Sequence, residues 1–229
     1  MAHTHRLFPF ALVSALVLTA CRPAPSTPLT SAALRGDVAQ VKTLLATTSA
    51  DTSADGWSPL IWAARAGRVE VMTLLLDAGA DPNRPDHRQG WTPLMHALHK
   101  QQGAAARLLL ARGADGARGA GGTSPVEMAA LDNDPDLLNL LLASPPSGDQ
   151  RRKAFDLAVS GGALADIDRP LLGSCHTETV RRLLASDRSL AHAGDGPGSP
   201  LWWARRQGCD EVIAMVAAAN TANLAQKTP

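Results

Sequence analysis

The stretch GWSPLIWAARAGRVEVMTLLLDAGADPN, residues 56–83, predicts two short helices joined by a tight turn. Ser58 suits the N-cap because its hydroxyl can accept a hydrogen bond from a free backbone amide. Pro59 suits the first helical position, where a missing N–H costs nothing. The apolar run at 71–76 predicts the second helix, and Gly79 suits the left-handed backbone that ends it. The stretch therefore predicts one helix–turn–helix unit.

The same pattern recurs along the chain. A Ser/Thr-Pro-apolar triplet occurs at residues 58–60, 92–94, 124–126 and 199–201, so that successive prolines lie 34, 32 and 75 residues apart. An alanine follows each proline after four residues, and a second apolar run follows the alanine. Because no such unit can bury its apolar face alone, the recurrence predicts a stack of units.

This recurrence resembles the ankyrin repeat, whose period is about 33 residues. The resemblance covers about residues 31–218 and implies an all-α solenoid of about six helix–turn–helix units. The expected units lie near residues 31–55, 56–83, 90–115, 122–143, 151–185 with an insertion at 163–175, and 198–218. Gln101 occupies a turn position where the family usually has glycine. Residues 219–229 are expected to form a flexible tail.

The N-terminal residues resemble an export signal followed by a tether. Residues 1–20 contain a basic start and an uncharged, mostly apolar run at 7–18, which is too short to span a bilayer as a helix. The tetrapeptide LTAC, ending at Cys21, resembles a bacterial lipobox, which implies cleavage before Cys21 and acylation of its thiol. An ordinary secretory signal peptide is the alternative. The proline-rich residues 21–30 are expected to form the tether.

The lipobox resemblance also implies a location. The chain is expected in the bacterial cell envelope, bound to a lipid bilayer through acylated Cys21 and facing the periplasm. Arg22 rather than aspartate follows the cysteine, which favours the outer membrane over the inner one.

Composition and motifs exclude several classes of function. The 229 residues carry 22 Lys+Arg and 21 Asp+Glu, a net charge of +1, whereas nucleic-acid binders usually have a basic face. His96 and His99 lie three residues apart on an expected helix, but no third ligand follows at a spacing typical of a metal site. We therefore predict a protein that is not an enzyme and that binds no cofactor, metal or nucleic acid.

Cys175 and Cys209 are the cysteines that remain beside Cys21. In an exported protein such a pair is a candidate disulfide. The repeat frame places both at the turns of adjacent units, about 10 Å apart, whereas a disulfide needs Cα atoms within about 7 Å. The insertion before Cys175 can close that gap. The sequence therefore allows two alternatives, a disulfide or two buried free thiols.

Ankyrin arrays bind other proteins through their hairpin tips and inner helices, and the resemblance implies the same here. The candidate contacts on inner helices are Trp62, Arg65, His96, His99, Lys100, Leu131, Asp132, Trp203 and Arg206. Those on the hairpin tip are Arg84, Asp86, His87, Arg88 and Gln89. We expect His96, His99 and the Trp62 and Trp203 indoles to be exposed, and Trp57 and Trp91 to stack on each other along the hairpins.

The predicted function is a membrane-anchored module that binds another protein and inhibits or scaffolds a periplasmic protein. The alternative is an envelope enzyme or small-ligand binder that uses the insertion at 163–175 as a lid. Its candidate residues are Asp166, Asp168 and His176.

Overall fold

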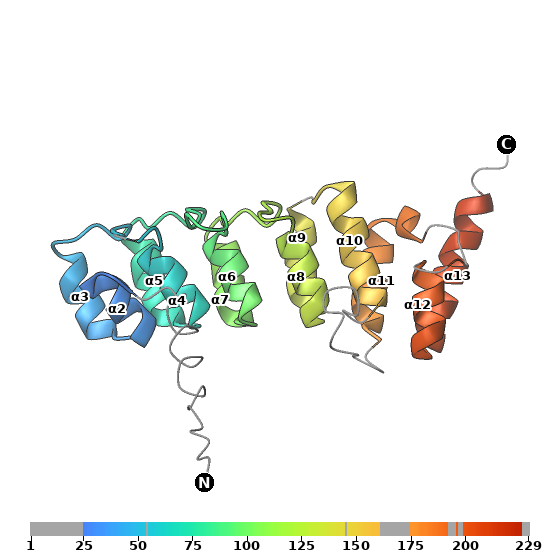
Figure 1. Ribbon diagram of the computed structural model, residues 1–229, viewed down its shortest axis with the longest axis horizontal. Coiled ribbons are helices and arrows are strands. Elements are labelled where there is room, and N and C mark those ends of the chain that lie inside the picture. The colour runs from blue at the N-terminus through green and yellow to red at the C-terminus, as the bar shows by residue number, and fades with distance from the viewer. Residues whose placement is uncertain are drawn as a thin grey trace, which may run out of the picture.

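The structure is a computed structural model that describes residues 25–53, 55–144, 146–160, 175–191, 196 and 199–225. Within these ranges the regular elements are helices, and the backbone pairing outside them is one isolated bridge, between Ala120 and Thr123 at a hairpin tip. The α-helices follow one another as six pairs stacked side by side into an elongated molecule (Figure 1). The predicted all-α repeat solenoid is confirmed.

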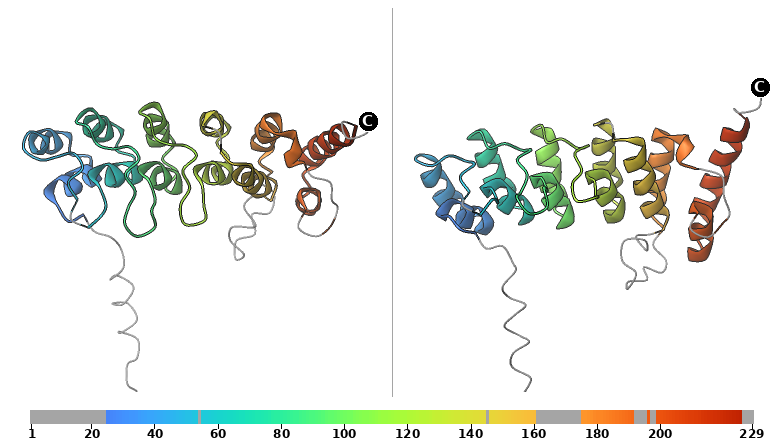
Figure 2. Two further views of the ribbon diagram at one scale, coloured as in Figure 1. Left: turned by 90° about the horizontal axis from the view of Figure 1, so that it is seen from above. Right: turned by 45° about the horizontal axis from the view of Figure 1, so that its top comes forward.

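The six pairs are α2 (Pro28–Arg35) with α3 (Val38–Leu45), α4 (Pro59–Arg65) with α5 (Val69–Asp77), α6 (Pro93–His99) with α7 (Gly103–Ala111), α8 (Pro125–Asp132) with α9 (Pro135–Ala143), α10 (Gly148–Val159) with α11 (Thr177–Ser186), and α12 (Pro200–Gln207) with α13 (Asp210–Ala225). A short 3-10 helix, η1 (Arg188–Leu190), follows α11. Figure 2 shows two layers: the first helix of each pair lies in an inner layer and the second in an outer layer. The loops between the early units project on the side of the inner layer.

The inner helices begin as the triplets predict. Ser58, Thr92, Ser124 and Ser199 each accept a hydrogen bond through the side-chain oxygen from the backbone N–H three residues on, at 3.2–3.5 Å. Proline follows each of these caps at the start of the helix. The repeated triplet therefore sets where each of these four inner helices starts.

The first helix begins earlier than the sequence led us to expect. Thr27 caps α2 through a reciprocal capping box with Thr30, and Pro28 occupies the first turn. The tether predicted at 21–30 is therefore wrong over its last three residues. The reason is that Thr27-Pro28-Leu29 is a further copy of the opening triplet. Cys21 and the predicted signal peptide lie outside the described residues.

The C-terminal end also differs from expectation. Helix α13 continues to Ala225, so the flexible tail predicted from residue 219 is helical over most of its length. The side chains of α13 explain part of this, because Asn223 donates hydrogen bonds to the carbonyls of Arg188 at 2.9 Å and Ala191 at 3.4 Å. Residues 163–174 of the predicted insertion are outside the described part of the chain.

The inner helices pack closely because small side chains separate them. Ala63, Ala97, Ala129 and Ala204, the alanines that follow the prolines, have no exposed surface. The buried apolar residues form one large cluster over the first four units and a second from the fourth unit to the last. Each unit thus buries its apolar side chains against its neighbours, as a stacked repeat requires.

A disulfide joins the last two units. Cys175 precedes α11 and Cys209 lies between α12 and α13, and the two cysteines are bonded with a Cα–Cα distance of 5.9 Å. Of the two alternatives left open by the sequence, the structure contains the disulfide.

Candidate functional site

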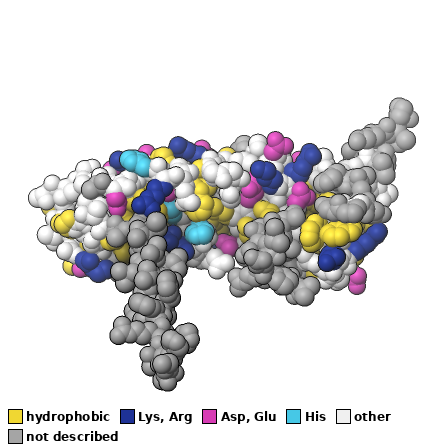
Figure 3. Space-filling view, viewed as in Figure 1, with side chains coloured by type: hydrophobic (Ala, Val, Ile, Leu, Met, Phe, Trp, Pro, Cys, Tyr) yellow, Lys and Arg dark blue, Asp and Glu magenta, His cyan; other side chains and the backbone are white. Residues whose placement is uncertain are grey.

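A pocket of about 340 Å³ opens on the inner-layer side between the second and third units. Arg65 comes from α4, and His96 and His99 come from α6. The loops that precede these helices supply the other lining residues, which are Trp57, Arg88, Gln89 and Trp91. Figure 3 shows basic, histidine and hydrophobic side chains beside one another on this part of the inner-layer face.

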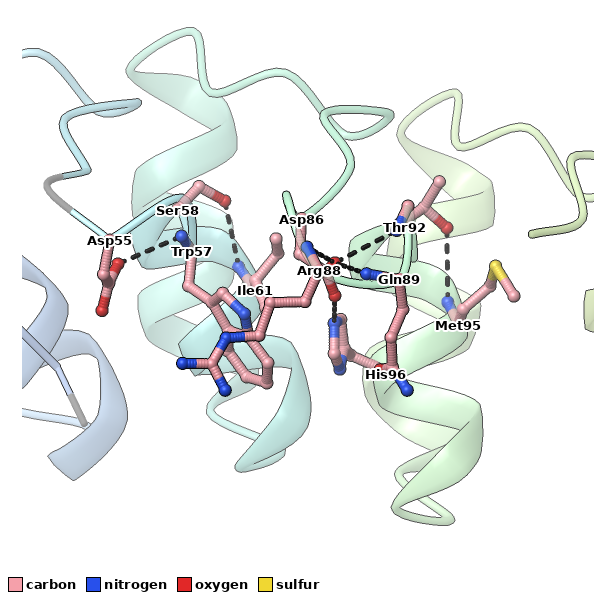
Figure 4. A network of polar contacts seen from close by, with 11 residues as sticks. Asp55, Trp57, Ser58, Ile61, Asp86, Arg88, Gln89, Thr92, Met95 and His96 are labelled. Atoms are coloured by element: carbon pink, nitrogen blue, oxygen red, sulfur yellow. Dashed lines mark hydrogen bonds and ion pairs between the residues drawn. The ribbon is translucent and has the colours of Figure 1, made fainter. Parts of the chain in front are cut away.

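A buried hydrogen bond between Asp86 and His96 supports the pocket from beneath. Asp86 Oδ1 accepts the backbone N–H groups of Arg88, Gln89 and Gly90 at 2.9, 2.7 and 3.2 Å. Its Oδ2 lies 2.7 Å from His96 Nε2 (Figure 4). Because a carboxylate accepts and does not donate, the hydrogen of this contact belongs to Nε2. Asp86 therefore holds both the turn of the loop and the orientation of the His96 ring.

The protonation states of the pair follow from burial and partners. Burial lowers the pKa of His96, and the positive charges of Arg65 and His99 lower it too, while the hydrogen bond and charge of Asp86 act in the opposite direction. Burial alone would raise the pKa of Asp86, but the Gln89 N–H and His96 outweigh it and lower that pKa. At neutral pH the pair is thus an aspartate beside a neutral imidazole.

Aromatic rings surround this imidazole. The centroid of Trp57 lies 4.5 Å from that of His96, and the centroid of Trp91 lies 5.5 Å from it on a separate loop. The prediction that Trp57 and Trp91 stack on each other is wrong, because His96 lies between them and contacts both. The guanidinium of Arg65 lies 5.6 Å from the centre of the Trp57 ring, which places a cation against an aromatic wall.

Three of the predicted contact residues are buried. Trp62, Asp86 and His96 are 4%, 3% and 1% exposed, so the expectation that Trp62 and His96 are exposed is wrong. Trp62 packs against Trp57 and against Leu34 of the first unit. Asp86 and His96 are covered because the loop folds back onto α6. These residues shape the pocket from within.

The other predicted contacts of this region are accessible. His99 and Lys100 at the end of α6, and His87, Arg88 and Gln89 on the loop, are exposed, and Arg84 is partly exposed. The structure brings Arg65, Arg88, Gln89 and His99 together around the pocket. Lys100 and Arg84 do not line it.

The remaining predicted contacts belong to other units. Leu131 and Asp132 are half-buried at the end of α8, where Gln101 donates a hydrogen bond to Asp132 at 3.2 Å. Trp203 is half-buried and Arg206 is exposed on α12, in the last unit. The predicted contacts therefore form three separate groups along the inner layer.

Of the candidate residues of the alternative function, the structure describes His176. His176 is 5% exposed, and its Nδ1 donates to the carbonyl of Ala130 at 2.9 Å. Burial lowers the pKa of this ring, in spite of that hydrogen bond. Asp166 and Asp168 lie outside the described residues. In the part of the chain that the structure describes, no group of three or more His, Cys, Asp or Glu residues is arranged to hold a metal ion.

Sequence reasoning missed the Asp86–His96 pair. The two residues are ten positions apart, on a loop and a helix, and no motif links them. The nearest signal in the sequence is Trp91, a large apolar side chain that directly follows the polar loop carrying Asp86.

Comparison with known proteins identifies the class of fold. The chain matches the family model of ankyrin repeats in three copies over residues 9–86 and the model of a single ankyrin repeat over 89–118. The crystal structure of the human ASB11 ankyrin repeat domain is similar, with a TM-score of 0.66 and 25% identity over 85% of this chain and 84% of that one. An ankyrin repeat domain from Acinetobacter baumannii AYE has a TM-score of 0.65 and 24% identity, covering 84% of this chain and 97% of that one.

A curated relative matches a shorter part. The 2-5A-dependent ribonuclease of Mus musculus is 46% identical over 59 residues, which is 24% of this chain and 8% of the ribonuclease. The chain thus spans a small fraction of that enzyme's length.

These findings define a helical repeat scaffold of the kind that generally binds other proteins. Within the chain, residues 9–86 and 89–118 are similar to ankyrin repeats. None of the helices in the described ranges is both long and apolar enough to cross a membrane.

Proposed function

We propose that this chain is a lipid-anchored ankyrin-repeat module of the bacterial envelope that binds a protein partner through the pocket between α4 and α6. The pocket is the single observation that carries the binding part. Tryptophan and arginine side chains dominate the energetics of protein interfaces, and here they surround a rigid, buried support. A partner held there would be inhibited or scaffolded on the periplasmic side.

The anchor part of the proposal depends on Cys21. The LTAC sequence suits lipidation of that cysteine, and acyl chains bind a bilayer with about 0.8 kcal/mol per buried CH₂. With α2 beginning at Pro28, residues 22–27 would separate the membrane from the stack. We propose the outer membrane as the location, because Arg22 follows the cysteine.

Metabolic labelling tests the anchor. Radiolabelled palmitate should enter the whole chain expressed in a bacterial host, and it should not enter the Cys21→Ser variant. The labelled chain should fractionate with outer rather than inner membranes. Absence of label from the unaltered chain would contradict lipidation, whatever the outcome for partner binding.

Site-specific cross-linking tests the binding surface. A photoactivatable phenylalanine analogue at Gln89, on the rim of the pocket, should yield a cross-linked protein in intact cells. The same analogue at Glu70, exposed on α5 of the outer layer, is the matched control and should not. Equal cross-linking at both positions would show that the inner-layer pocket is not the binding surface.

A further inference from the structure

Two buried nitrogen atoms at the pocket between α4 and α6 have no hydrogen-bond partner among the described residues. They are Trp57 Nε1 and His96 Nδ1. Both residues line the pocket, their ring centroids lie 4.5 Å apart, and they are 5% and 1% exposed. Because buried polar atoms are normally paired, two unpaired atoms on adjacent rings of one pocket indicate a site for a polar ligand.

The two nitrogen atoms have opposite roles in hydrogen bonding. The indole Nε1 of Trp57 is a donor and cannot accept. His96 Nε2 donates its hydrogen to Asp86 Oδ2 at 2.7 Å, so Nδ1 of the neutral ring is an acceptor. A ligand that satisfies both atoms must therefore present an acceptor and a donor side by side.

The charges around the pocket favour a neutral ligand. Arg65 and Arg88 line the pocket, and the carboxylate of Asp86 lies beneath it. The Arg65 guanidinium is already engaged, with the Trp57 ring among its partners. An anion or a cation would meet a charge of its own sign in this pocket. A neutral dipole can instead turn its N–H toward His96, which the aspartate polarises, and its oxygen toward the Trp57 donor.

We propose that this pocket receives the carboxamide side chain of an asparagine or glutamine of the protein partner. The inference rests on the proposed function and adds the chemistry of recognition. The amide oxygen accepts from Trp57 Nε1, and an amide N–H donates to His96 Nδ1. Figure 4 shows the Arg88 side chain passing in front of Trp57. Arg88 is exposed and long, so it can move aside to admit the amide.

A side-chain amide fits this pair of atoms better than other polar groups of a protein do. Its oxygen and one N–H lie on the same edge of a planar group, whereas the C=O and N–H of a trans peptide bond point in opposite directions. A carboxylate has no hydrogen for His96 Nδ1, and an ammonium or guanidinium group has no acceptor for Trp57 Nε1. The rings of Trp57 and Trp91 can also cover the methylene groups of the incoming side chain.

Matched peptides on an array test the proposal. Each peptide has glutamine, glutamate or the methyl ketone analogue of glutamine at its centre, and the flanks are identical within a set and varied between sets. A parallel series uses asparagine, aspartate and the ketone analogue of asparagine. The ketone keeps the carbonyl oxygen and replaces the NH₂ group by methyl, so it lacks the donor for His96 Nδ1. The amide peptides should capture about tenfold more of the purified full chain than either analogue, which corresponds to one hydrogen bond to a buried acceptor.

Two variants and a control assign each hydrogen bond. His96→Gln keeps a donor for Asp86 but removes the Nδ1 acceptor, so amide and ketone peptides should be captured equally. Trp57→Phe keeps an aromatic ring but removes the donor, so it should reduce capture of both peptides and leave their ratio unchanged. Trp91→Phe makes the same change on the other aromatic wall of the pocket and should keep both the capture and the ratio. Circular dichroism confirms that each variant is folded.

Four results would overturn the inference, and the first three need only the unaltered chain. They are equal capture by amide and ketone peptides, no capture by any amide peptide, stronger capture by the glutamate or aspartate peptides, and an amide preference that His96→Gln retains. If cross-linking through Gln89 persists in any of these cases, the protein-binding function stands and only the recognition of a carboxamide fails.

Discussion

At the residue scale, one aspartate organises the loop between the second and third units. Asp86 is nearly completely buried, and it is stable as an anion because it accepts three backbone N–H groups and a ring hydrogen. A buried carboxylate without such partners would be costly. The same contacts position His96 between Trp57 and Trp91, so the shape of the pocket depends on this side chain.

Replacing Asp86 should therefore destabilise the protein strongly. Asp86→Ala leaves backbone N–H groups and the His96 ring without an acceptor, and we expect a loss of about 3 kcal/mol in the free energy of unfolding. Asp115→Ala is the control, since that exposed aspartate accepts, among the described residues, the single N–H of Ala117 in a local turn at 2.9 Å. Its cost should stay below about 1 kcal/mol by urea unfolding. Similar losses for both variants would contradict the role assigned to Asp86.

Stability should also fall as the pH is lowered through the ordinary histidine range. Burial lowers the pKa of His96 below its ordinary value of 6.5 and does the same for His176, so both rings take up protons more readily when the chain unfolds. The stability that these two neutral rings contribute is fully present above pH 6.5, and it is lost as the pH falls from 6.5 toward their pKa values in the folded state. The lowered pKa of Asp86 changes the stability of the protein only below pH 3.8, the ordinary pKa of aspartate, and therefore outside the histidine range.

Urea unfolding at about pH 7.5 and about pH 5.5 measures this effect. The unaltered chain should be less stable at the lower pH, and the difference should shrink in the His96→Gln variant. Stability that does not change between these two conditions would contradict burial of neutral rings.

At the element scale, the turns within units show how the chain accommodates an exception. Gly36, Gly67 and Gly208 adopt the left-handed backbone at this turn, with φ of 79°, 66° and 70°. Gln101 adopts the same conformation with φ of 56° in the third unit, and Asn133 does so with 52° in the fourth. Asparagine tolerates this conformation, whereas glutamine does so at a cost. The unit geometry thus imposes the conformation whatever the side chain.

The variant Gln101→Gly should consequently stabilise the third unit. Glycine relieves the left-handed backbone strain, which costs glutamine about 1–2 kcal/mol. This gain exceeds the cost of the greater chain entropy of glycine in the unfolded state, about 0.5–1 kcal/mol. The variant also loses the side-chain hydrogen bond to Asp132, but that bond is exposed and contributes little. We expect a net gain of about 0.5 kcal/mol in thermal or urea unfolding. Gln101→Val, which is β-branched, should instead lower stability. A glycine variant less stable than the unaltered chain would refute this account.

At the scale of the whole molecule, stability depends on contacts between neighbouring units. The apolar core is divided into two clusters that share the fourth unit, and the second of them includes the disulfide between Cys175 and Cys209. Helices α12 and α13 pack against α10, α11 and η1 of the preceding unit. The disulfide ties this terminal unit to the rest of the stack.

Removing the disulfide should therefore loosen one end of the molecule. The double variant Cys175→Ser with Cys209→Ser should lose about 4 kcal/mol of stability, the loop-closure value for a disulfide between residues 34 apart. Hydrogen–deuterium exchange should increase in α12 and α13 and stay unchanged in α4 to α7, because stability in a stack is transmitted between neighbours. Uniform acceleration along the chain would show that the stack unfolds as a single unit.

The sequence alone determined the repeat and most helix starts. Ser58-Pro59 and its copies specify caps by local hydrogen bonding, and local rules need no knowledge of distant residues. The same rule applied to Thr27-Pro28 would have found the first helix, which we placed inside a tether. At the pocket, the resemblance to ankyrin repeats identified Arg65, Arg88, Gln89 and His99 as candidate contacts, and these four do line it.

The tertiary structure decided which of the candidates are buried and which meet. His96 and Trp62 were assigned to the exposed face, but the loop around Asp86 and the first unit cover them. It also decided that Cys175 and Cys209 are bonded, because the repeat spacing alone placed their Cα atoms about 10 Å apart, beyond the reach of a disulfide. The physical reason is the same in both cases. Contacts between separate units depend on how the units stack, and no short stretch of sequence determines the distance between residues of different units.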